Sequence, residues 1–351
     1  MLKVFFLSSA ALAAFSISAS AQSENGFAVP PENVVVTATR IATPIEQVAS
    51  AITVIDAADI DSRQQRSLPD VLRDVPGLNL VQSGGEGGQT SIFMRGTNSN
   101  HTKILIDGID VADPSNPNGS YDIGKLLSGD IASVEVLRGP QSGLYGSDAI
   151  GGVINIVTKA GEGPAQWSLS AEGGSFQTFN QNAAVSGSDN GFHYALDVQH
   201  YHAGATPVTP LDLLLPGEAR NDDFDDNVTV SGKFGYDVTD NFDLGLVTRY
   251  ISSREHITGD DTDPVTFASF PAATQTHENN LEYQTRATAH LVLWDGAFDQ
   301  TLGLAYSSNV GANLGPSGSY PNSGERIKID WQGNIALGDG ERLVLGAEHA
   351  R

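Results

Sequence analysis

The chain has 351 residues, contains no cysteine and carries a formal net charge of −23. The lack of cysteine excludes disulfides, thiolate metal sites and cysteine nucleophiles. So acidic a protein is a poor candidate for binding nucleic acid by charge, and we expect no nucleic-acid partner. The length is sufficient for two domains.

Residues 1–21 have the pattern of a secretory signal peptide. Lys3 gives a positive start, residues 4–14 are an apolar run, and Ala19-Ser20-Ala21 matches an A-x-A cleavage site. The apolar run is too short to cross a membrane, and no later segment has about 18 consecutive apolar residues. We therefore expect an exported protein, for which insertion into a membrane would require a β-barrel.

Residues 22–43 are expected to form an extended linker, because the segment is polar and contains Pro30-Pro31. Within it, residues 32–40 read ENVVVTATR and are rich in β-branched side chains. Two interpretations fit this run. It is either the first strand of the next domain or a strand that is lent to a partner protein by β-augmentation.

Residues 44–160 predict a compact domain of mixed α and β structure. Asp56 is placed to cap a helical turn over 57–60, and residues 67–74 predict a short helix with Pro69 in its first turn. Strands are expected over 51–55, 78–81, 91–95, 103–106, 134–137 and 152–157. The glycines between the last two strands are interpreted as tight turns. The loops 83–89 and 113–121 are longer and polar, so this scaffold could present them to a ligand.

Residues 165–351 alternate between apolar and polar side chains over long segments, for example 242–250, 297–307 and 326–334. A soluble β-sandwich also alternates, but its strands usually have only about five or six residues. At about ten residues per membrane strand, the segment predicts roughly nine strands of a barrel. An odd, open set of strands cannot close, and the last one stops without a turn, so we expect the chain to be a fragment of a longer protein.

No enzyme motif is present. Residues 119–125 resemble part of a P-loop, but Leu126 stands where Ser or Thr should bind Mg²⁺, and neither G-x-S-x-G nor H-E-x-x-H occurs. His200 and His202 would share one face of a strand, which is more typical of an ordinary polar pair than of a metal site. We therefore expect a protein that is not an enzyme and has no covalent cofactor.

Two acidic runs, 222–226 and 260–263, are expected in long loops. Flexible loops with several carboxylates can bind Ca²⁺, although solvated loop charge is an equally good interpretation. The candidate calcium ligands are Asp222, Asp223, Asp225 and Asp226.

Four segments together resemble the TonB-dependent outer-membrane receptors: VVVTATR, LPDVLRDVPGL, SIFMRGTNSNHTKILIDGI and VEVLRGPQSGLYGSDAIGGVINIVTK. The chain looks most similar to the vitamin B12 (cobalamin) receptors of that family. The resemblance implies a mainly β protein of the Gram-negative outer membrane. A small α+β plug domain (44–160) would precede the N-terminal part of an antiparallel transmembrane barrel (165–351) that has about 22 strands in full.

The resemblance also implies partners and sites. TonB would pair in the periplasm with residues 32–40, the TonB box of the family, and energise the import of cobalamin. The loops 83–89 and 113–121 would bind ligand, and aspartates of an outer loop would hold Ca²⁺. An iron–siderophore or another metal chelate is the alternative ligand, and a passive porin-like channel is the alternative of another class. The implied TonB-binding residues are Glu32, Asn33, Val34, Val35, Val36, Thr37, Ala38 and Thr39. The implied ligand-binding residues are Ser83, Gly84, Gly85, Glu86, Gly87, Gly88, Gln89, Asp113, Ser115, Asn116, Asn118, Ser120 and Tyr121.

Overall fold

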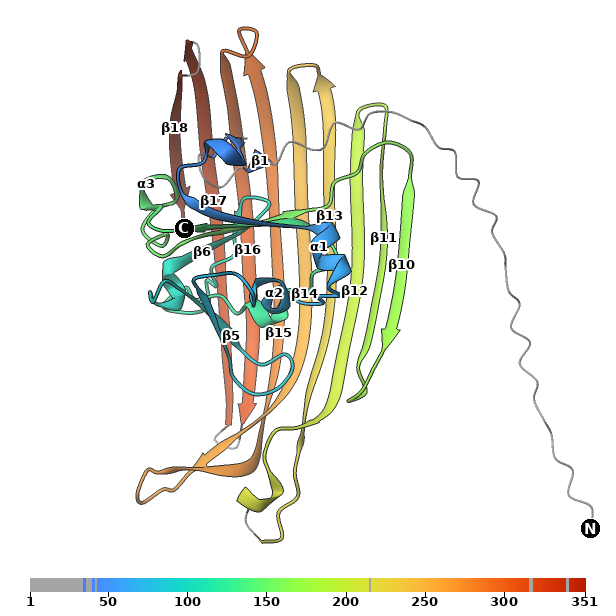
Figure 1. The fold of residues 1–351 in the computed structure, drawn as a ribbon, viewed down its shortest axis with the longest axis vertical. Helices are drawn as coiled ribbons and strands as arrows, with labels where there is room; N and C mark the ends of the chain where they lie inside the picture. Colours follow the sequence, from blue (N-terminus) through green and yellow to red (C-terminus); the bar gives the residue numbers. More distant parts are fainter. Residues whose placement is uncertain (1–33, 36–39, 42, 215, 316–317, 339–340) are drawn as a thin grey trace, which may run out of the picture. The chain divides into compact units, whose positions relative to one another are not determined.

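The structure is a computed structural model that describes residues 34–35, 40–41, 43–214, 216–315, 318–338 and 341–351. The predicted signal peptide and most of the predicted linker lie outside the described residues. In the part of the chain that is described, no helix has the length and apolar character needed to cross a membrane. The described chain consists of an N-terminal α+β domain followed by one long antiparallel sheet (Figure 1).

The N-terminal domain is built on a five-stranded sheet with the order β3-β8-β9-β6-β7, beside a two-stranded sheet of β4 and β5. Strands β6 and β9 are parallel, and the other neighbours are antiparallel. The strands are β3 (Ala51–Asp56), β4 (Leu78–Gln82), β5 (Thr90–Met94), β6 (Thr102–Ile106), β7 (Ile109–Asp110), β8 (Ile131–Arg138) and β9 (Gly152–Thr158). The helices are α1 (Ala57–Ser62), α2 (Leu68–Leu72), α3 (Ser142–Tyr145) and the 3-10 turns η1 (Ile45–Gln47), η2 (Ser99–His101) and η3 (Ile123–Lys125).

Local sequence signals locate these elements well. The Asp56 carboxylate accepts a hydrogen bond from the Asp59 backbone N–H at 2.8 Å and caps α1, as predicted. Pro69 lies in the first turn of α2, where its missing N–H has no helical partner to lose. The core between the helices and the sheets consists of fully buried aliphatic side chains, among them Leu68, Leu72, Ile123, Val134, Val136 and Ile154.

Gly152 opens β9 with a φ of +153°, and a Cβ there would overlap the Leu137 carbonyl oxygen and the Met94 sulfur. We expect Gly152→Ala to destabilise the domain by about 2–3 kcal/mol, because backbone on one side leaves no room for relaxation. The matched control is Gly163→Ala, whose φ is +64° but whose added Cβ meets nothing within 4 Å. Hydrogen exchange of the β9 amides measures the difference, and equal protection in both variants would contradict the packing argument.

The long sheet has nine strands in sequence order, β10 to β18, and every neighbouring pair is antiparallel. This number agrees with the sequence expectation, and the sheet is an open part of a barrel with β10 and β18 at its edges. The strands are β10 (Gln166–Gly173), β11 (Phe179–Asp189), β12 (Phe192–Pro207), β13 (Asp222–Thr239), β14 (Phe242–Thr262), β15 (Ser269–Leu293), β16 (Phe298–Gly315), β17 (Gly318–Gly338) and β18 (Glu341–Ala350).

The two faces of the sheet differ in polarity as the alternation predicts. On β16, Leu302 and Leu304 lie on one face and are 49% and 54% exposed, whereas Ala305 lies on the opposite face and is buried. The same face carries exposed Tyr250, Leu281, Tyr283 and Ile329 from other strands. The opposite face carries buried polar residues and contacts the N-terminal domain. This is the arrangement of an apolar surface outside and a polar lining inside.

The connections of the sheet from β10 to β16 alternate between longer and shorter ones. Residues 190–191, 240–241 and 294–297 form short turns, whereas 174–178, 208–221 and 263–268 are longer, and 208–221 contains η4 (Leu211–Leu213). The long connections lie together at one end of the sheet, at the bottom of Figure 1. The sheet therefore has a long-loop end and a short-turn end.

Candidate functional site

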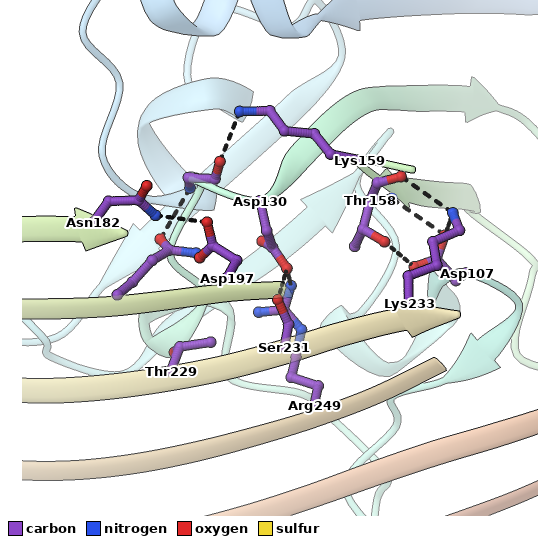
Figure 2. A network of polar contacts seen from close by, with 12 residues as sticks. Asp107, Asp130, Thr158, Lys159, Asn182, Asp197, Thr229, Ser231, Lys233 and Arg249 are labelled. Atoms are coloured by element: carbon purple, nitrogen blue, oxygen red, sulfur yellow. Dashed lines mark hydrogen bonds and ion pairs between the residues drawn. The ribbon is translucent and has the colours of Figure 1, made fainter. Parts of the chain in front are cut away.

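Buried polar contacts join the N-terminal domain to the inner face of the sheet (Figure 2). The Asp130 carboxylate pairs with the Arg249 guanidinium of β14 and accepts a hydrogen bond from Ser231 Oγ of β13 at 2.7 Å. Asp130 and Arg249 are both 3% exposed. Burial alone would raise the pKa of Asp130, but the adjacent guanidinium lowers it below its ordinary value. The pair is therefore a charged contact between the two parts of the chain.

Further contacts surround this pair. Lys233 Nζ of β13 donates to Asp107 Oδ1 at 2.8 Å, and the Gly129 N–H donates to Gln199 Oε1 of β12 at 3.0 Å. Figure 2 shows Lys233 beside Asp107, and Ser231 and Arg249 on neighbouring strands close to Asp130. Buried charges and amides in such a network must keep their partners. The network therefore fixes the domain in one position on the sheet β10–β18, which we call the wall.

The loop 83–89 is docked on the long-loop half of the wall. Its Gly85 N–H donates to Asp223 Oδ2 of β13 at 3.1 Å. Gly87 has a φ of +76° and lies so close to the Asp225 carboxylate that a Cβ there would overlap it. Glycine in this loop therefore serves close approach to the wall.

The loop 113–121 is folded by its own side chains and docked on β15 and β17. Asp113 Oδ1 accepts from the Ser115 N–H at 2.8 Å, and the Ser120 N–H donates to Asn118 Oδ1 at 2.8 Å. Tyr121 OH donates to Glu282 Oε2 of β15 at 2.9 Å, and Asn322 Nδ2 of β17 donates to Ser115 Oγ at 3.1 Å. The loop is thus held rigidly against the inner face.

A cavity of about 300 Å³ lies between the second loop and the wall, and we call it the apex chamber. Polar side chains dominate its lining. The lining residues are Gln89, Asp113, Ser115, Asn116, Pro117, Ser120, Tyr121, Asp122 and Lys125 from the N-terminal domain, and Glu278, Asn279, Asn280, Glu282, Asn309, Gly311, Ala312, Asn313 and Asn322 from the wall.

Lys125 is the cation of the apex chamber, and carboxylates surround it. Its Nζ is 3.5 Å from Asp122 Oδ2 and 3.9 Å from Glu255 Oε1. Burial alone would lower the pKa of Lys125, but these two carboxylates raise it above its ordinary value. Burial also raises the pKa of the Tyr121 hydroxyl, and the nearby Glu282 carboxylate raises it further. Lys125 is therefore charged and Tyr121 is neutral at physiological pH.

The structure brings together only some of the predicted ligand-binding residues. Gln89, Asp113, Ser115, Asn116, Ser120 and Tyr121 line the apex chamber. Asn118 lines a neighbouring cavity of about 70 Å³, and Glu86 and Gly87 line another of about 60 Å³ beside Tyr201. Ser83, Gly84, Gly85 and Gly88 line none of these three cavities.

The expected loop position of the four candidate calcium ligands is wrong. Asp222, Asp223, Asp225 and Asp226 lie in β13, where alternation sends neighbouring side chains to opposite faces. Asp223 and Asp225 are buried against the loop 83–89, while Asp226 lies 3.3 Å from Arg254 on the other face. The second acidic run also enters a strand, because β14 extends to Thr262. Among the described residues, no group of three or more His, Asp or Glu side chains is placed to hold a metal ion.

His200 and His202 lie on one strand face, as predicted, and share Asp226 as a neighbour at 3.8 and 3.4 Å. The pair remains an ordinary polar cluster on β12 and β13. Of the predicted TonB-binding residues, Glu32, Asn33, Val36, Thr37, Ala38 and Thr39 lie outside the described residues. Val34 and Val35 form β1 (Val34–Val35), which pairs antiparallel with β2 (Thr43–Pro44).

Arg40 is attached near the short-turn end. Gln332 Nε2 of β17 donates to the Arg40 carbonyl oxygen at 2.8 Å, and the Arg40 guanidinium lies 4.5 Å from the centre of the Tyr145 ring. The apex chamber contacts the other half of β17 through Asn322. Arg40 and the chamber therefore contact opposite halves of β17.

Residues 44–153 match the family model described as TonB-dependent Receptor Plug Domain. The match covers nearly all of the N-terminal domain and supports its interpretation as a plug, the name used for this domain below. The alternating wall that follows it has the inward polarity and the docking contacts that a plugged barrel requires.

Solved structures of receptors share the fold of the chain. A mutant of the ferric enterobactin receptor of Pseudomonas aeruginosa matches with 19% identity and a TM-score of 0.67, over 90% of this chain and 50% of that one. The pyoverdine outer membrane receptor of the same species matches with 16% identity and a TM-score of 0.73, over 90% of this chain and 48% of that one. The ferric yersiniabactin uptake receptor of Yersinia pestis matches with 16% identity and a TM-score of 0.54, over 86% of this chain and 61% of that one. The chain thus spans about half the length of the structures it matches.

Proposed function

We propose that the chain belongs to a TonB-dependent receptor that binds a metal chelate outside the outer membrane and imports it with energy supplied through TonB. The apex chamber is the observation that carries this proposal. It lies between a plug loop and the barrel wall, and the loop is held there by Tyr121 and Ser115. A ligand in this chamber would touch both parts, so its arrival could alter how the plug is held.

The second support is the position of the strand-lending segment. Val34 and Val35 already have strand geometry, and the attachment at Arg40 lies toward the short-turn end. A partner that adds a strand here and pulls would load the plug from the side opposite the chamber. This geometry suits ligand on one side and TonB on the other.

An iron–siderophore chelate is the favoured ligand. The receptors of similar fold are named for ferric enterobactin, pyoverdine and ferric yersiniabactin, which supports a ferric chelate over cobalamin. A passive porin is disfavoured, because a diffusion pore has no need of a plug fixed to its wall by buried charges such as Asp130 and Arg249.

Transport into cells tests the proposal. Cells that make the natural full-length protein should accumulate radiolabelled ferric siderophore, and an uncoupler of the proton-motive force should stop the accumulation. Labelled cyanocobalamin serves as the competing ligand in the same cells. Uptake that continues after uncoupling would support the porin instead, and uptake of cyanocobalamin alone would restore the cobalamin assignment.

A further inference from the structure

We infer that the apex chamber selects a neutral or cationic chelate and rejects a polyanionic one. This rests on the proposed function, because it names the charge class of the ligand at the same site. Four carboxylates line the chamber, from Asp113, Asp122, Glu278 and Glu282, against the single ammonium group of Lys125. No arginine lies in the described lining.

The ammonium group is not free to neutralise a ligand. Lys125 is 89% buried at its side chain and lies between Asp122 and Glu255. Both oxygens of Glu255 are buried without a hydrogen-bond partner among the described residues. Lys125 is thus already paired with acidic groups of the protein, so an anion that approached would find no unpaired cation in the described lining.

Three amide side chains of the chamber donate within the protein and so help to fix their own orientation. Asn280 Nδ2 donates to Glu282 Oε1 at 2.8 Å, Asn116 Nδ2 to the Ser120 carbonyl at 3.3 Å, and Asn322 Nδ2 to Ser115 Oγ at 3.1 Å. Their carbonyl oxygens, like the carboxylates of the lining, are acceptors for the hydrogen-bond donors of a ligand.

Two acceptors in the lining point most directly to a ligand. Asn309 is 7% exposed, and its Oδ1 has no hydrogen-bond partner among the described residues. The Glu278 carboxylate forms no hydrogen bond or ion pair within the part of the chain that is described, although it lines the same cavity. A buried acceptor without a donor is costly, so an N–H group of a ligand would satisfy Asn309 Oδ1, and an ammonium group would pair with the half-buried Glu278 carboxylate.

Charge in this chamber acts strongly because the walls are protein. Opposite charges a few ångströms apart near a protein surface attract several times more strongly than they do in bulk water. A hydroxamate chelate of iron that carries a free amine is cationic, whereas a tris-catecholate chelate is highly anionic. The chamber therefore distinguishes two chemical classes of siderophore that carry the same metal.

Binding to the natural full-length protein in detergent tests this inference. The probes are a ferric trihydroxamate with a free amine and a ferric tris-catecholate, each titrated at low and high salt. We expect the cationic chelate to bind at least about tenfold more tightly and to lose affinity as salt rises. Glu278→Lys should weaken it by about tenfold or more, Glu278→Gln less, and Asn309→Leu severalfold. Asp295→Asn, an exposed carboxylate at the short-turn end, is the matched control and should change nothing.

The outcomes separate this inference from the proposed function. If neither chelate binds and neither is taken up, the proposed function fails. If the tris-catecholate binds as well as the cationic chelate, or Glu278→Lys leaves the preference intact, the charge selection is wrong while a chelate receptor stands. Correct folding of each variant is checked by its resistance to protease, so that a loss of binding is not confused with a loss of structure.

Discussion

Arg249→Met is expected to weaken the attachment of the plug to the barrel wall by about 3–5 kcal/mol, because it leaves the buried Asp130 carboxylate without its counter-charge. Asp130 is 3% exposed, and its other partner, the Ser231 hydroxyl, is neutral. Desolvation of an unpaired carboxylate is the dominant cost. The plug should then open from the wall far more often than in the natural protein.

Hydrogen exchange of the plug amides in the purified protein measures this opening. Exchange should accelerate over β8 and β9, which flank Asp130, while the strands of the wall keep their protection. The matched control is the double variant Asp130→Leu with Arg249→Met, which removes both charges. Because a buried pair can be replaced by apolar side chains at little cost, the double variant should recover most of the loss. A double variant as unstable as the single one would show that packing, not charge, holds the plug here.

The elements of the plug could be predicted from sequence because local signals determine them. The Asp56 cap and Pro69 give the starts of α1 and α2, and a dense run of glycines marks the turns before β9. Strand alternation likewise gave the number of strands in the wall. These features depend on neighbours in sequence, so one chain is enough to read them.

The expected loop position of the four aspartates was wrong because strand length is decided by pairing with neighbouring strands. The polar run at the start of β13 looked like a loop, yet it pairs with β12 at Pro207 and with β14 at His256 and beyond. Once the run is a strand, its carboxylates divide between two faces. Carboxylates that form an acidic cluster in the sequence can therefore be separated in space.

The wall side of the apex chamber was missed although a signal exists. In the stretch from Glu278 to Gln284, every second residue is polar, and Leu281 and Tyr283 alternate with them. The polar set lies on the inner face, where Glu282 meets Tyr121. Alternation identifies which face is polar. Only the fold shows that the loop 113–121 lies opposite this face, because Tyr121 and Glu282 are 161 residues apart in the sequence.

Val35→Pro is expected to lower energised uptake strongly while chelate binding is retained. Val35 belongs to β1 and pairs with Thr43, and its run is the segment proposed to lend a strand to TonB. Proline has no N–H and fits poorly inside a paired strand. Each backbone bond lost at the partner contributes about 0.5–1.5 kcal/mol, so uptake should fall by about tenfold or more.

The design separates energy coupling from ligand binding. The apex chamber lies on the other side of the plug, so the affinity for the chelate should match that of the natural protein. Val35→Ile keeps both the backbone N–H and the β-branched side chain, and it should support normal uptake. Uptake that persists in Val35→Pro would exclude strand addition at this residue. A loss of binding would instead place Val35 in the support of the plug and contradict a role in energy coupling alone.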